Sequence, residues 1–156
     1  MHNYALPKHH LVCQKRKRTR LMQMGEIIPQ EIALKLEMLS GMLNQGSYEY
    51  TTQDPTAVNQ LSFFAHLIVF PSGSHLELEC GESWKERTLS GVMLGASPIK
   101  HTASRIFSIV KMGEDWFLQR GEQTIRDEFG ELSNRTLGVQ DLDTYVTATL
   151  ARLQSA

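Results

Sequence analysis

The chain has 156 residues, of which 41% are hydrophobic and 21% charged, and its formal net charge is −1. This length suits one domain that can bury a hydrophobic core without disulfide bonds or bound metal ions. The composition excludes disordered, collagen-like and strongly basic proteins. Two cysteines are too few for a disulfide scaffold, and the longest apolar run, FFAHLIVF, is too short to span a bilayer. We therefore expect a cytoplasmic protein without a membrane span.

Residues 1–24 are interpreted as a basic arm, because they contain six basic residues and no acidic one. The rest of the chain, residues 25–156, has all 17 acidic residues and is predicted to form a single domain. In an extended arm, alternate side chains would project about 6.6 Å apart, which suits a row of phosphates. The candidate anion-binding residues are Lys15, Arg16, Lys17, Arg18 and Arg20. The basic run is either a solvated segment, or an arm that lies on the acidic domain or on a sister subunit, or a binding site for RNA or DNA. An acidic protein or a membrane surface is a further alternative.

The first predicted element is a helix over residues 29–45, with Pro29 at its first position and Gly46 at its C-terminal stop. Its apolar residues recur at helical spacing and predict a buried face; they are Ile32, Leu36, Leu39 and Leu43. A further apolar stripe of Leu34, Met38 and Met42 makes the helix apolar on more than one side. We therefore expect these three residues to contact a partner.

Two alternating segments, SFFAHLIVF and HLELEC, predict a hairpin around the loop PSGS. If Phe70 lies opposite His75, then Ile68 lies opposite Glu77, and His66 opposite Glu79. One face of this hairpin is apolar and predicts the core; it contains Phe63, Ala65, Leu67, Val69, Leu76, Leu78 and Cys80. The other face is mixed, as expected for a surface that is only partly covered.

With the remaining elements, the predicted order along the chain is a helix, an antiparallel meander and a second helix. DPTAVNQL predicts a short helix with Asp54 as its N-cap, and RTLSGVML a strand. RIFSIVKM and WFLQRG predict a second hairpin around GED, whereas EQTIRDEFGEL fits a helix or a strand. VQDLDTYVTATLARLQ predicts the C-terminal helix. The expected fold is α+β, with an antiparallel sheet of about five or six strands flanked by an N-terminal and a C-terminal helix.

His66 opposite Glu79 is the candidate catalytic pair, since a carboxylate can orient an imidazole for proton transfer. A cross-strand ion pair is the alternative interpretation. His75 and Glu77 share that face, but their spacing matches no metal motif, so neither a metal nor a cofactor is expected. Cys80 falls on the core face and is expected to be an inert buried thiol.

These patterns favour a non-enzymatic interaction protein, an adaptor, chaperone-like protein or assembly subunit, which uses the apolar helix and the mixed sheet face. Self-association, in particular as a homodimer, or a protein partner is expected. The first alternative is a nucleic-acid-associated protein that binds phosphates through the arm regardless of sequence. The second alternative is a small enzyme that uses the His66 and Glu79 pair.

Overall fold

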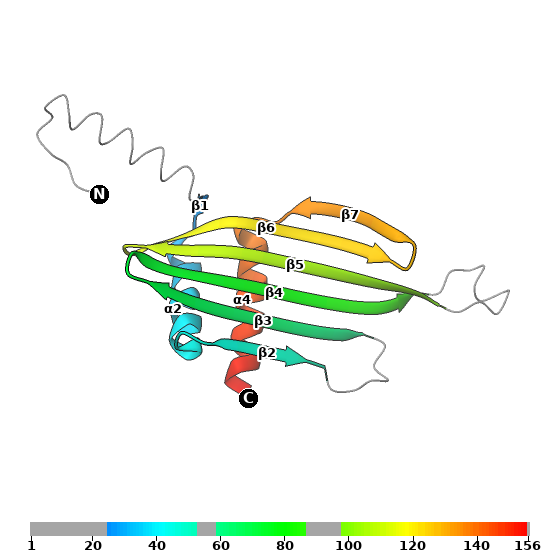
Figure 1. Cartoon of the computed structure of the whole chain (residues 1–156), viewed down its shortest axis with the longest axis horizontal. Helices are drawn as coiled ribbons and strands as arrows, with labels where there is room; N and C mark the ends of the chain where they lie inside the picture. The colour runs from blue at the N-terminus through cyan, green and yellow to red at the C-terminus, as the bar shows by residue number, and fades with distance from the viewer. Residues whose placement is uncertain (1–24, 53–58, 87–97, 156) are drawn as a thin grey trace, which may run out of the picture.

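The computed structural model describes residues 25–52, 59–86 and 98–155. The arm, the strand expected in RTLSGVML and the start of the helix expected at Asp54 lie outside these ranges. Within them the fold is α+β, as predicted (Figure 1). Along the chain, one helix precedes most of an antiparallel meander and a second helix follows it. The sheet has seven strands, more than expected, in the order β1-β6-β5-β4-β3-β2, with β7 also paired to β6. The strands are β1 Glu26–Ile27, β2 Ser47–Thr51, β3 Gln60–Phe70, β4 Gly73–Glu86, β5 Ile99–Met112, β6 Asp115–Asp127 and β7 Gly130–Thr136.

Helix α2 spans Gln30–Leu43, close to the predicted range. Pro29 directly precedes the helix, and its carbonyl oxygen accepts hydrogen bonds from the amides of Ile32 and Ala33. The helix ends two residues earlier than predicted, because Asn44 adopts the left-handed conformation with φ 48°. Asparagine tolerates this conformation better than most residues, so a glycine is not needed there.

The first hairpin has the predicted faces but a different register. Phe70 pairs with Gly73, so a two-residue turn joins β3 to β4 in place of the four-residue loop. The prediction that His66 lies opposite Glu79 is therefore wrong: His66 pairs with Glu77. The tight turn requires a glycine where β4 starts, because a Cβ on Gly73 would lie 2.0 Å from the carbonyl oxygen of Lys111. A shift of two residues leaves every side chain on its expected face.

The second hairpin and the C-terminal helix are confirmed. β5 and β6 meet with Met112 paired to Asp115, so their turn also has two residues. The ambiguous segment EQTIRDEFGEL is not helical: it forms the end of β6, a turn and the start of β7. Helix α4 spans Val139–Ser155. None of the helices in the described part of the chain is long and apolar enough to cross a membrane.

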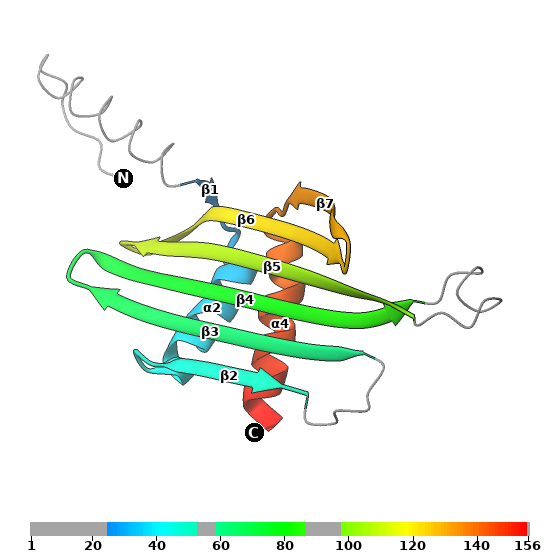
Figure 2. The ribbon, with the colours of Figure 1, turned by 45° about the vertical axis from the view of Figure 1, so that its right-hand side comes forward.

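Both helices lie on the same face of the sheet and cross its strands, while the opposite face is left without a helix (Figures 1 and 2). The core fills the space between these two layers, and its members come from both helices and from the central strands. Lys35 of α2 forms an ion pair with Asp143 of α4 at 2.7 Å and so joins the two helices. The completely buried side chains include Leu36, Leu39, Leu76, Phe107, Ile109, Leu142 and Val146.

The outer edge of β6 is shared by two strands from distant parts of the sequence. β1 pairs with Phe117 and Leu118, and β7 pairs with residues 122–127. Between them, the amide of Leu137 donates to the carbonyl oxygen of Gly121 at 2.8 Å. Gly25 precedes β1 with φ 98°, where a Cβ would lie 2.1 Å from the carbonyl oxygen of Leu118. Only a glycine fits at this position, which lies next to the part of the edge that the chain around β7 occupies.

Candidate interaction surfaces

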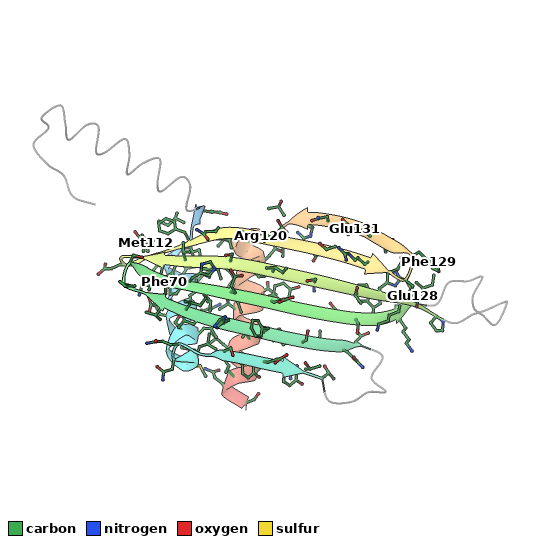
Figure 3. The ribbon with its side chains drawn as sticks, in the orientation of Figure 1. Phe70, Met112, Arg120, Glu128, Phe129 and Glu131 are labelled. Atoms are coloured by element: carbon green, nitrogen blue, oxygen red, sulfur yellow. The ribbon has the colours of Figure 1, made fainter. Side chains whose placement is uncertain are left out.

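The sheet face opposite the helices, here called the open face, carries aromatic, aliphatic and charged side chains together. Ile68 and Phe70 are both exposed there, by 38% and 49%. Figure 3 shows Phe70 and Met112 at one end of the sheet and Phe129 at the opposite end. The open face thus has apolar side chains beside charged ones, whereas Phe129 belongs to the turn between β6 and β7.

A polar cluster that was not predicted lies on β4 and β5 of the open face. Nε2 of His75 and Oε1 of Glu77, both on β4, are within hydrogen-bonding distance. The hydroxyl of Ser108, on β5, donates to the same carboxylate oxygen at 2.8 Å and lies 3.0 Å from the same ring nitrogen. His66 is not part of this set of hydrogen bonds. Ser108 lies beside Glu77 because the two residues pair directly across β4 and β5, a pairing that was not predicted from the sequence.

A serine, a histidine and a glutamate in contact suggest the catalytic triad of hydrolases, but the atoms that meet here are the wrong ones. In a triad the histidine uses one ring nitrogen for the serine and the other for the carboxylate. Here Nε2 of His75 faces both Ser108 and Glu77. An Nε2 that donates its proton to the carboxylate cannot also accept the serine proton, so the cluster does not activate a nucleophile. Its chemistry is that of a hydrogen-bonded polar cluster on a half-buried surface.

A row of side chains, here called the acidic row, crosses the open face at right angles to the strands. The pairing places Glu49, Phe64, Glu79, Ile106 and Glu122 side by side on five successive strands. Glu122 is already bound to Arg120 at 2.7 Å. Within the described residues, Glu49 and Glu79 have no ion-pair partner. The row therefore holds two unpaired carboxylates, one on each side of an aromatic ring.

A shallow hollow of about 310 Å³ lies at these two carboxylates, lined by Glu49, Ser62, Phe63, Phe64, Glu79 and Gly81. Its floor depends on Gly81, because a Cβ at that position would come within 2.6 Å of Ser62 Oγ. The hollow is open to solvent on the side of the sheet that no helix covers. Its chemistry is anionic and aromatic, which suits a cationic group and not a phosphate.

The predicted partner-binding stripe on α2 is exposed. Leu34, Met38 and Met42 are exposed by 58%, 51% and 41%. The opposite side of the same helix is buried in the core, as the spacing of its other apolar residues predicts. Met38 Sδ lies 3.8 Å from the side-chain amide of Gln154 on α4, so the stripe borders the second helix. The molecule thus has a second exposed apolar surface, on the layer opposite the open face.

Cys80 is buried on the helix side of β4, as expected, with 3% of its surface exposed. Burial raises the pKa of its thiol to about 12, although the positive charge of Arg105 acts in the opposite direction. Arg105 itself is held by Gln123 at 2.8 Å and Glu82 at 3.4 Å, and it stacks over the Tyr145 ring. Since the nucleophilic form of a cysteine is the thiolate, Cys80 is a packing residue.

No group of three or more potential metal ligands occurs among the residues that the structure describes. The predicted anion-binding residues, Lys15, Arg16, Lys17, Arg18 and Arg20, lie outside the described ranges. Comparison of the chain with protein-family models, with curated proteins and with solved structures finds no match. The functional argument therefore depends on the surfaces of this chain alone.

Proposed function

We propose that this chain is a non-enzymatic interaction protein whose main contact surface is the exposed stripe on α2, and that a second copy of the chain covers this stripe. The proposal is carried by one observation: three long apolar side chains, spaced four residues apart, stay exposed on a helix whose other side is fully buried. The open face of the sheet lies on the other layer and is not used in this contact.

The geometry of α2 suits helix pairing. Side chains at positions i, i+4 and i+8 form one ridge along a helix, and such ridges pack into the grooves of another helix. Two of the three residues are methionines, whose flexible side chains adapt to an irregular partner surface. Because the stripe lies on the outer side of the helix layer, two copies can meet without disturbing the core.

The polar groups of the described residues give less support to an enzyme. The cluster of His75, Glu77 and Ser108 has no free base for the serine, and the hollow at Phe64 is shallow and open. Catalysis requires convergent groups that exclude water around a reacting atom. The pair of His66 and Glu79 on which the enzyme hypothesis depended is not directly opposed in the sheet.

The test is the mass of the full chain in solution, measured by sedimentation equilibrium over a dilution series. We expect the wild-type chain to form a dimer of twice 17.7 kDa. Met38→Glu places a charge in the centre of the stripe and should weaken the dimer by about tenfold or more, the loss typical of a central interface position. The exposed position of Met38 means that the variant should still fold.

Thr102→Glu is the matched control, because Thr102 is exposed and lies on the open face of β5, on the layer opposite α2. It should dimerise like the wild type. A wild-type chain that remains monomeric at tens of micromolar would overturn the proposal, as would a dimer that Met38→Glu leaves unchanged.

A further inference from the structure

We propose that the acidic row on the open face is the docking site of the chain's own basic arm, and that an arginine of residues 14–20 lies over Phe64 between Glu49 and Glu79. This inference does not depend on the α2 dimer, because the row and the stripe lie on opposite layers of the molecule. It rests on charge complementarity, on the shape of the hollow and on the position at which the arm joins the sheet.

The charges of the two segments are opposite and unpaired. The arm has six basic residues and no acidic residue of its own to neutralise them. The row has three carboxylates and no basic residue, and two of the three lack a partner among the described residues. In an extended arm, Arg16, Arg18 and Arg20 project from one side about 6.6 Å apart. Carboxylates on alternate strands are about 10 Å apart, which flexible arginine side chains can span.

The hollow at Phe64 has the shape and the chemistry that a guanidinium group requires. A planar cation is stabilised over the face of an aromatic ring, and flanking carboxylates supply acceptors for its N–H donors. The same molecule already uses this contact on the helix side of the sheet. Arg152 lies 4.8 Å from the centre of the Tyr50 ring, and Arg105 lies 5.2 Å from the centre of the Tyr145 ring. Gly81 leaves the space for such a side chain on the open face.

The arm joins the sheet at a point from which the acidic row can be reached. β1 runs antiparallel to β6, so the chain before Glu26 heads along β6 towards Glu122. The chain around β7 occupies that edge from Gly121 onwards, which prevents the arm from continuing as an edge strand. The row extends about 20 Å from β6 to β2, whereas the nine residues from Arg16 to Gly25 reach about 30 Å when extended. The arm is therefore long enough to lie across the face.

The first experiment measures how fast trypsin cuts the arm in the full-length protein. Cleavage after the lysine and arginine residues of positions 15–20 is followed by mass spectrometry. The wild type is compared with the double variant Glu49→Gln/Glu79→Gln. The variant removes two exposed charges and adds no bulk, so the fold is retained. We expect cleavage about fivefold faster in the variant, the factor for two surface ion pairs of about 0.5 kcal/mol each. Salt near 0.5 M should accelerate cleavage of the wild type but not of the variant.

The matched control is Glu31→Gln/Glu114→Gln, which makes the same change in charge at two exposed positions off the open face. It should leave the cleavage rate unchanged. The proposal is overturned if the double variant in the row is cut at the wild-type rate, or if the control variant is cut equally fast.

The second experiment needs no substitution. A carbodiimide joins a lysine amine to a carboxylate that it contacts, so Lys15 or Lys17 should become linked to Glu49 or Glu79 in the full chain. An equal mixture of unlabelled and nitrogen-15-labelled chains shows whether both ends of a link belong to one molecule. Links within one label support docking of the arm on its own domain. Links between labels, the absence of links, or links that appear only after single-stranded RNA is added, would overturn it.

Discussion

The buried thiol of Cys80 gives a prediction whose magnitude follows directly from the structure. Burial raises its pKa from 9.0 to about 12. At pH 8, a thiol with pKa 9.0 is about 9% thiolate, and one with pKa near 12 is about 0.01% thiolate. Because only the thiolate attacks a disulfide reagent, we expect native Cys80 to react roughly a thousandfold more slowly than an ordinary cysteine. The core also shields the sulfur atom from the reagent, which slows the reaction of Cys80 further.

The assay is the reaction with Ellman's reagent in a Cys13→Ser background, so that Cys80 is the only thiol. The rate is measured in native buffer and again in concentrated guanidinium chloride, where the thiol is accessible. A native rate within about tenfold of the denatured rate would refute the reasoning, because it would require either an exposed thiol or an unshifted pKa.

The same pKa shift makes the stability of the protein fall at alkaline pH. The thiol of the unfolded chain loses its proton near pH 9, whereas the folded thiol keeps it until about pH 12. Within this window the unfolded state binds fewer protons, so each pH unit lowers the free energy of unfolding by about 1.4 kcal/mol. Cys80→Ala should lack this contribution, which urea titrations of both proteins at pH 8 and pH 10 can detect.

Three further predictions follow from other contacts. The hydrogen bond from Lys111 lowers the pKa of Glu37. The contribution of this carboxylate to stability is therefore complete above the pKa of the unfolded carboxyl, near 4.5, and is lost as the pH falls below it. The stability of Glu37→Gln, measured in urea at pH 6 and pH 4, should fall less on acidification than that of the wild type. A Cβ on Gly121 would lie 2.4 Å from the carbonyl oxygen of Leu137, so Gly121→Ala should lower the free energy of unfolding by about 2 kcal/mol or more in a denaturant titration. A Cβ on Gly138 meets nothing within 4 Å, so Gly138→Ala should change this free energy by less than about 0.5 kcal/mol. If the arm lies on the acidic row, RNA must displace it, so single-stranded RNA should bind the Glu49→Gln/Glu79→Gln variant about fivefold more tightly than the wild type. Equal affinities, with a slope of about −3.5 in log affinity against log salt that is lost without residues 1–24, would instead identify the arm as a free tether for five phosphates.

The main elements could be predicted from the sequence because each has a strong local signal. α2 has apolar residues at helical spacing between Pro29 and Asn44, and both hairpins alternate apolar and polar residues. The division of the first hairpin into a core face and a mixed face depends only on odd and even positions. For that reason it remained correct although the register was shifted by two.

The details that were not predicted depend on contacts between distant residues. The register of the first hairpin depends on the close approach of Gly73 to Lys111, on another strand. β7 is exposed along its whole length, so no apolar pattern identified it as a strand. The acidic row and the cluster of His75, Glu77 and Ser108 appear only when strands are placed side by side in the correct register. Sequence spacing within one segment does not contain this information.

The shared edge of β6 has a consequence for the order in which the protein is made. β2 to β6 each pair with the next strand in the sequence, and such local pairs form early. β1 is different, because its partners Phe117 and Leu118 come about ninety residues later. During synthesis, the basic N-terminal segment therefore leaves the ribosome long before its anchoring position exists. Throughout that interval the basic segment lacks its anchor on β6, and the polyanions of the ribosome lie close to it.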